Sequence, residues 1–64
     1  MVVRITENKK RFLNLLLLAD EQESMIDRYL ERGEMFVLYK NEIPVAACVI
    51  TDEGDNVCEI KNIA

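Results

Sequence analysis

The sequence has two thiol side chains, Cys48 and Cys58, and thiols are among the most reactive groups in proteins. They lie ten residues apart inside apolar stretches, and the sequence has no CxxC pair and no histidine to complete a zinc-binding set. A cysteine nucleophile also needs an adjacent base, and histidine is the usual one. We therefore expect no metal site with soft ligands, and two small thiols that serve as core residues.

A glutamate within an apolar stretch, Glu59, is the carboxylate best placed for chemistry. It lies between Cys58 and Ile60, in a segment that has the character of a strand, and strand interiors disfavour glutamate. One interpretation is a solvent-facing side chain paired with a neighbouring strand or with Lys61. The other is a functional carboxylate.

Other acidic residues gather in two places. Asp20, Glu21 and Glu23 stand close together between two apolar stretches. An acidic rim there would attract a cationic amine, although helix capping explains the same residues without a ligand. The sequence DEGDN, residues 52–56, lacks the spacing of an EF-hand loop and indicates a solvated hairpin tip.

Length and composition limit the classes of protein that remain. Sixty-four residues make at most one small domain, and 50% hydrophobic with 31% charged residues is typical of a globular chain. Because the chain has a net charge of −4, nucleic acid and anionic lipid would repel it. We expect neither as a partner.

A basic run followed by the segment FLNLLLLA, residues 12–19, has some features of a signal peptide. However, apolar residues and Glu7 precede the basic run, which is not typical of a signal peptide. Leu17 also stands where a small residue should precede the cleavage site. The apolar run is also far shorter than the roughly twenty residues that cross a bilayer. A cytoplasmic protein with reduced thiols is therefore expected.

Helical patterns fill the first half of the chain after a short strand within residues 1–6. Thr6 can cap the helix that follows, whose basic beginning should fray, and positions 12, 13, 16 and 17 form an apolar stripe. Asp20 and Glu23 then form a variant capping box for a second helix. Met25 and Tyr29 belong to its apolar stripe, and Gly33 ends it as a left-handed stop.

After Gly33 the apolar period changes from 3.6 to 2 residues. Strands are predicted at 34–39, 43–51 and 57–64, with turns at Asn41 and Gly54 where a positive φ is tolerated. The middle strand is apolar throughout, so we expect it to be covered on both faces. The predicted fold class is α+β, in the order β-α-α-β-β-β with an antiparallel sheet.

The last strand reaches Ala64 without a polar tail. We therefore expect residues 1–64 to be a single partial domain that is truncated in its last strand. Its open edge is a template for association, which predicts a homodimer through the exposed strand edge.

This order of elements, together with the segment RGEMFVLYKNEIPVAACVITDEGDNVCEIKNIA, resembles the N-terminal half of the GNAT superfamily of N-acetyltransferases. The resemblance covers nearly all of this chain and about half of that fold. The last strand matches the pattern E-[IL]-x-x-[LI]-A. The pyrophosphate-binding loop R/Q-x-x-G-x-G/A of the family and its late tyrosine are absent from these residues, and Ala46 stands where a glycine often begins the third strand.

The resemblance implies a function and a site. The full-length protein would transfer an acetyl group from acetyl-CoA to an amine acceptor, while the fragment alone would be inactive and would not bind acetyl-CoA tightly. Glu59 falls where some family members carry the general base. Ile63 and Ala64 fall where relatives hold the pantetheine arm with backbone groups. The alternative, from another functional class, is a small non-catalytic α/β interaction module that folds as a dimer.

Overall fold

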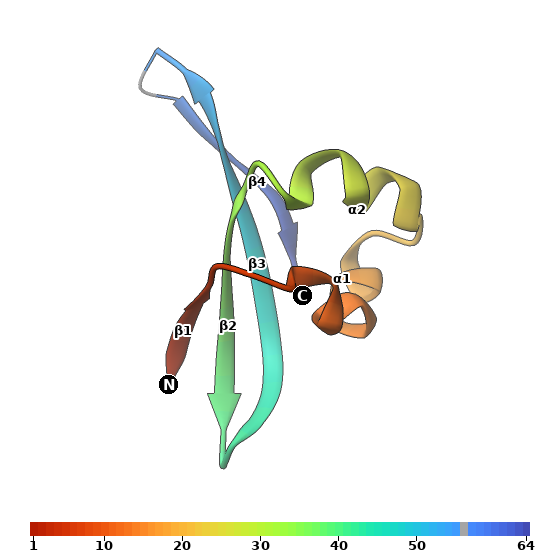
Figure 1. The fold of residues 1–64 in the computed structure, drawn as a ribbon, viewed down its shortest axis with the longest axis vertical. Helices are drawn as coiled ribbons and strands as arrows, with labels where there is room; N and C mark the ends of the chain where they lie inside the picture. The colour runs from red at the N-terminus through yellow and green to blue at the C-terminus, as the bar shows by residue number, and fades with distance from the viewer. Residues whose placement is uncertain (56) are drawn as a thin grey trace.

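One antiparallel sheet, with its strands in the order β1-β2-β3-β4, runs through the computed structural model, which describes residues 1–55 and 57–64 (Figure 1). The strands are β1 (Val2–Ile5), β2 (Glu34–Lys40), β3 (Ile43–Gly54) and β4 (Val57–Ile63). Within these residues β1 and β4 are the two edge strands. The order of elements confirms the predicted α+β class and the β-α-α-β-β-β arrangement.

The helical segments between β1 and β2 pack on one face of this sheet (Figure 1). They are a 3₁₀ turn η1 (Lys9–Phe12), α1 (Leu13–Ala19) and α2 (Glu23–Leu30). The prediction that the first helix starts at a Thr6 cap is wrong. Asn8 adopts a left-handed conformation with a φ of 51°, and the 3₁₀ turn follows it. A frayed beginning is also ruled out there, because Phe12 and Lys9 are buried.

Lys9 explains why this basic segment is ordered. Its ammonium donates hydrogen bonds to the carbonyl oxygens of Leu30 at 2.9 Å, Glu31 at 3.3 Å and Gly33 at 2.7 Å. These carbonyls belong to the end of α2 and the residues after it, where helical partners run out and the helix dipole attracts a cation. The side chain therefore joins η1 to the connection between α2 and β2.

The predicted ends of α2 need two corrections. Gln22 is the N-cap, and the Asp20 carboxylate accepts a hydrogen bond from the backbone N–H of Gln22, so the proposed capping box does not form. Gly33 does not have a positive φ. Its role is close approach, because a Cβ there would lie 2.6 Å from Cγ1 of Val49.

The core lies between the helices and the near face of the sheet. The most deeply buried side chains are Leu16, Ile26, Leu30, Met35, Val37, Val49 and Thr51. The expectation that β3 is covered on both faces is wrong for the described residues. Ala47 and Val49 face the helices, whereas Ala46 and Cys48 alternate with them and lie on the opposite face, half-buried.

The opposite face of the sheet, which we call the open face, carries much exposed apolar surface. Val2, Leu38 and Ile63 all point to it, and they are 65%, 41% and 69% exposed. Two predicted core residues also lie at the surface, since Met25 is 41% exposed and Cys58 is exposed.

Both predicted turns have the expected backbone at their key residues. Asn41 has a φ of 51° between β2 and β3, and Gly54 has a φ of 85° at the end of β3. The rest of the second turn includes residue 56, which lies outside the described residues. These turns set the register of the β2–β3–β4 meander, which holds the candidate site.

Candidate functional site

The strand β4 and Ala64, the residue directly after it, carry every residue that the sequence analysis assigned to catalysis or cofactor binding. The upper part of β4 pairs Thr51 with Glu59 and Ile50 with Ile60. A register shift follows, so that Val49 pairs with Asn62 and Lys61 is left as the extra residue of a β-bulge. The bulge divides β4 into a segment with Glu59 and a segment with the strand end.

Glu59 stands on the segment before the bulge. Its Oε1 lies 3.1 Å from Nζ of Lys61, and the Glu59 side chain is 52% exposed. The structure therefore contains the ion pair with Lys61 that the solvent-facing interpretation predicts. The carboxylate remains open to a ligand as well, because about half of it faces solvent.

Further charged groups surround this segment. The Thr51 hydroxyl donates a hydrogen bond to Oε2 of Glu53 at 2.6 Å, and Arg32 forms an ion pair with the same oxygen at 3.2 Å. The Thr51 hydrogen bond, followed by the Arg32 hydrogen bond, holds the pKa of Glu53 below its ordinary value. Glu53 is therefore an ionised neighbour of Glu59 with fixed partners.

Ile63 and Ala64 form the end of the strand. Ala64 exchanges two backbone hydrogen bonds with Ala47, at 3.0 and 2.8 Å. In an antiparallel ladder the residue before such a pair turns its N–H and C=O away from the partner strand. The backbone groups of Ile63 therefore point to the free edge of β4.

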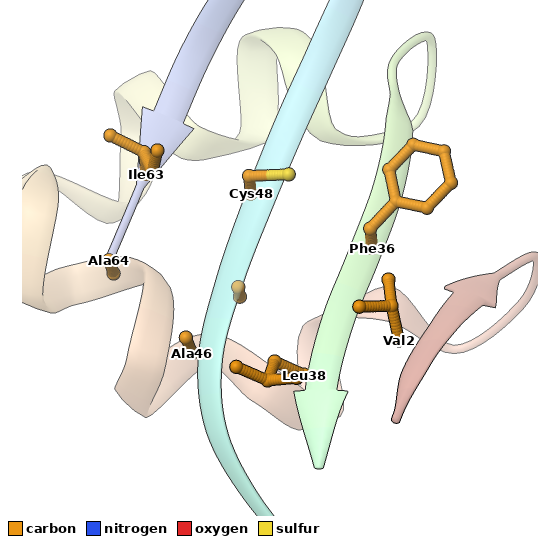
Figure 2. Close-up of a pocket in the computed structure, with 8 residues that line it drawn as sticks. Val2, Phe36, Leu38, Ala46, Cys48, Ile63 and Ala64 are labelled. Atoms are coloured by element: carbon orange, nitrogen blue, oxygen red, sulfur yellow. The ribbon is translucent and has the colours of Figure 1, made fainter.

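The same strand end borders a hollow on the open face, with a volume of about 210 Å³. Figure 2 shows this face with the helices behind the sheet, and with Ile63, Cys48 and Phe36 in front of it. Almost all of the lining is aliphatic or aromatic. The hollow can hold an apolar group beside the strand end.

Glu59 and the strand end do not meet in one contact. Glu59 is the cross-strand partner of Thr51, which is buried on the helix side of the sheet. Ile63 is the partner of Cys48 and lies on the open face. Ala64 also lies five positions after Glu59 along the strand, which is at most roughly 17 Å at about 3.3 Å per residue. A substrate that used both would have to pass around the free edge of β4.

The acidic residues at the junction of α1 and α2 are largely engaged. Lys10 forms ion pairs with Glu23 and with Asp27, and these carboxylates raise the pKa of Lys10 above its ordinary value. Asp20 caps the backbone of Gln22 and accepts a hydrogen bond from the Tyr29 hydroxyl at 3.3 Å. These contacts favour the capping and packing interpretation of the cluster over an acidic rim.

Sequence analysis missed the buried polar residue of β4, Asn62. It is 3% exposed, and its Nδ2 donates to the Leu16 carbonyl at 2.9 Å and to the Tyr29 hydroxyl at 3.0 Å. Burial raises the pKa of Tyr29, although the Asn62 hydrogen bond opposes that shift. The signal in the sequence was an amide side chain within a strand segment that is otherwise rich in apolar residues, because a buried amide needs hydrogen-bond partners.

Metal binding and membrane insertion gain no support from the described residues. No group of three potential ligand side chains comes together in residues 1–55 and 57–64. Cys48 and Cys58 are free thiols. Within the same residues, none of the helices has the length and apolar character needed to span a bilayer.

A second hollow, of about 460 Å³, opens at the other end of the helix layer. Val3, Ile5, Arg11 and Tyr39 are among the residues that line it. None of the candidate residues Glu59, Ile63 and Ala64 borders it. It is therefore separate from the site on β4.

Comparison with known proteins connects this fold to a family, although no protein-family model matches the sequence. The chain is 34% identical over 58 residues to the uncharacterized N-acetyltransferase YvbK of Bacillus subtilis (strain 168). This match covers 91% of the chain and 37% of YvbK. A GNAT family acetyltransferase from Elizabethkingia anophelis, solved with acetyl-CoA bound, superposes with a TM-score of 0.91 at 33% identity. The IAA acetyltransferase from Bacillus cereus ATCC 14579 superposes with a TM-score of 0.83 at 32% identity.

Both structural matches cover 100% of this chain, but only 42% and 43% of the solved chains. The chain thus spans less than half the length of each of these proteins. In sequence and in fold, the chain is similar to a part of GNAT family acetyltransferases.

Proposed function

We propose that the protein carrying this chain transfers an acetyl group from acetyl-CoA to an amine. The observation that carries the proposal is the superposition of the whole chain on a GNAT acetyltransferase with acetyl-CoA bound, at a TM-score of 0.91. The similarity to an N-acetyltransferase over 91% of the chain supports the same activity. Direct attack of a neutral amine on the thioester would form the amide and release the thiol of coenzyme A.

Residues 1–64 form the N-terminal part of the catalytic domain in this proposal. The proteins that match the chain are more than twice as long, so the larger part of each has no counterpart here. The open face supports the same division, because Val2, Leu38 and Ile63 leave apolar surface exposed that a complete domain would bury. The fragment alone would be inactive.

Glu59 serves as the general base in this proposal. An ammonium acceptor must lose a proton before its nitrogen can attack, and an exposed carboxylate can take that proton directly or through a water molecule. The half-exposed side chain of Glu59 supports this role. Lys61, at 3.1 Å, would hold the carboxylate in one orientation.

The end of β4 serves the cofactor. The backbone groups of Ile63 point to the free edge, where they can bind the pantetheine arm and polarise the acetyl carbonyl. Ala64, through its two hydrogen bonds with Ala47, keeps the strand end in place. We also propose a cytoplasmic location, supported by the two free thiols.

Two measurements test the proposal. Purified full-length protein should release free thiol from acetyl-CoA when a panel of primary amines is supplied, and the acetylated amine should appear in equal amount. The 64-residue chain alone should show no calorimetric binding at micromolar acetyl-CoA, because the phosphate-binding loop is absent from it. Absence of transfer with every amine, despite bound acetyl-CoA, would contradict the proposed activity.

A second candidate function is a non-catalytic module that folds as a homodimer. Two observations favour association: β4 is an edge strand within the described residues, and the open face carries exposed apolar side chains. Edge-to-edge pairing of two β4 strands would continue the sheet. Small domains of this size often gain stability in that way.

Sedimentation equilibrium of the 64-residue chain at tens of micromolar should therefore give a mass above that of one chain, with a melting temperature that rises with concentration. Replacing Ile60 by lysine on the exposed part of β4 should shift the mass toward the monomer. A mass near 7.4 kDa, with a cooperative melt independent of concentration, would show that the chain does not associate.

A further inference from the structure

The end of β4 adopts a register that apolar burial alone does not favour. The bulge at Lys61 turns Asn62 toward the helices, where it is 3% exposed, and leaves Ile63 69% exposed on the open face. Within residues 1–64, taken alone, these two side chains therefore occupy the positions that the hydrophobic effect would exchange. Another interaction must select this arrangement.

A competing register can be written from the same sequence. If the ladder continued without a bulge below the pair of Ile50 and Ile60, Lys61 would pair with Val49. The next pairs would then be Asn62 with Cys48 and Ile63 with Ala47. A shift of one residue exchanges the two faces of the strand, so Ile63 would enter the core and Asn62 would face solvent. Lys61, on an edge strand, could still extend its ammonium into water.

The hydrogen bonds of Asn62 exist only in the observed register. Both N–H groups of its amide are used, one by the Leu16 carbonyl at 2.9 Å and the other by the Tyr29 hydroxyl at 3.0 Å. Tyr29 in turn donates to Asp20 at 3.3 Å, and Leu16 also accepts the backbone N–H of Asp20. A single side chain of β4 thus hydrogen-bonds to both helices, and through Tyr29 it is linked to the junction between them.

Simple stabilisation does not account for this buried amide. Its Oδ1 atom is buried and has no hydrogen-bond partner among the described residues, which costs free energy relative to an apolar side chain of similar size. Buried polar groups with such a cost are best known for selecting one register over another. Because a competing register exists on the same strand, Asn62 can act in this way and select the observed register.

We propose that Asn62 is a positioning residue that locks the bulge at Lys61 and thereby fixes the register of the end of β4. The lock acts through Leu16 and Tyr29. In the competing register, Ile63 would pair with Ala47 and turn its N–H and C=O toward β3, away from the free edge. The consequence for acetyl-CoA rests on the proposed function, whereas the register itself does not.

A cross-strand disulfide can report the register without any cofactor. Cys48 and Ile63 are directly opposite each other in the observed register, as a pair that is not hydrogen-bonded. Their Cα atoms should therefore lie about 4.5 Å apart, within the range that a disulfide spans. In the variant Ile63→Cys with Cys58→Ser, oxidised glutathione should close this disulfide rapidly, with two thiols of the protein oxidised and one glutathione disulfide reduced.

Adding Asn62→Asp to that variant keeps the size and polarity of the side chain but removes both N–H donors and sets a carboxylate against the Leu16 carbonyl. Disulfide formation should slow at least tenfold, because position 63 then turns toward the helices. Tyr29→Phe, which keeps the ring and removes one acceptor of Asn62, should slow it at least twofold and decides the matter if the aspartate variant does not fold. Ile5→Val, a core change in the distant strand β1, is the control for lost stability and should leave the rate unchanged.

An unchanged rate in the folded Asn62→Asp variant, or in Tyr29→Phe, would overturn the proposal. An equal slowing by Ile5→Val would overturn it too, since the effect would then follow stability rather than register. Because none of these rates depends on acetyl-CoA, the register lock can fail while the proposed acetyltransferase function stands, and the reverse also holds.

Discussion

Replacing Lys9 by methionine should lower the free energy of unfolding by about 3 kcal/mol, because three carbonyls, in two buried contacts and one part-buried contact, lose a charged donor. The Lys9 ammonium contacts the carbonyls of Leu30, Glu31 and Gly33 at 2.7 to 3.3 Å, and the residue is only 7% exposed. Methionine keeps the apolar stem, so the loss reports the ammonium. Thermal denaturation followed by circular dichroism should show a melting temperature at least ~10 °C lower.

The adjacent lysine provides a matched control. Lys10 has the same charge and lies next in sequence, but its ion pairs with Glu23 and Asp27 are exposed to solvent. Solvent-exposed ion pairs contribute little to stability, so Lys10→Met should change the melting temperature by at most a few degrees. Equal losses for the two variants would show that the buried contacts of Lys9 do not stabilise the junction of α2 and β2.

The order of elements was predictable because each element carries its own local signal. The change of apolar period after Gly33 and the positive-φ residues Asn41 and Gly54 fix three strands and their antiparallel pairing. The apolar stripe with Phe12 and Leu16 likewise indicates a covered helix, and both residues are buried. Such signals need no knowledge of distant contacts.

The details that failed depend on contacts between distant residues. Lys9 was expected in a fraying helix end, yet carbonyls more than twenty residues away order it. Gly33 was assigned to a left-handed stop, although Val49, on another strand, is what excludes a Cβ. Local sequence cannot show which segment will supply such partners.

The candidate site was predictable only in part, for the same reason. The pairing of Glu59 with Lys61 follows from their spacing and was foreseen as one alternative. The bulge at Lys61 and the inward turn of Asn62 depend on Leu16 and Tyr29, which lie 46 and 33 residues away. These long-range contacts determine which backbone groups reach the free edge.

The catalytic role of Glu59 leads to the largest expected change in activity. In the full-length protein, Glu59→Gln keeps the size of the side chain and removes its ability to accept a proton. Turnover should therefore fall about 10²-fold, a typical loss when a general base is removed. The measurement is acetyl-CoA-dependent thiol release with a saturating amine, recorded as kcat and as kcat/KM across pH.

Glu53→Gln is the matched control, because Glu53 is a neighbouring carboxylate whose partners are Thr51 and Arg32 rather than a substrate. It should leave kcat within about twofold of the parent, while Glu59→Gln should also change the shape of the pH–rate profile, since a proton acceptor has been lost. If both variants keep the parent's turnover and profile, Glu59 is only the solvent-facing partner of Lys61. The amine must then be deprotonated by another group or by solvent.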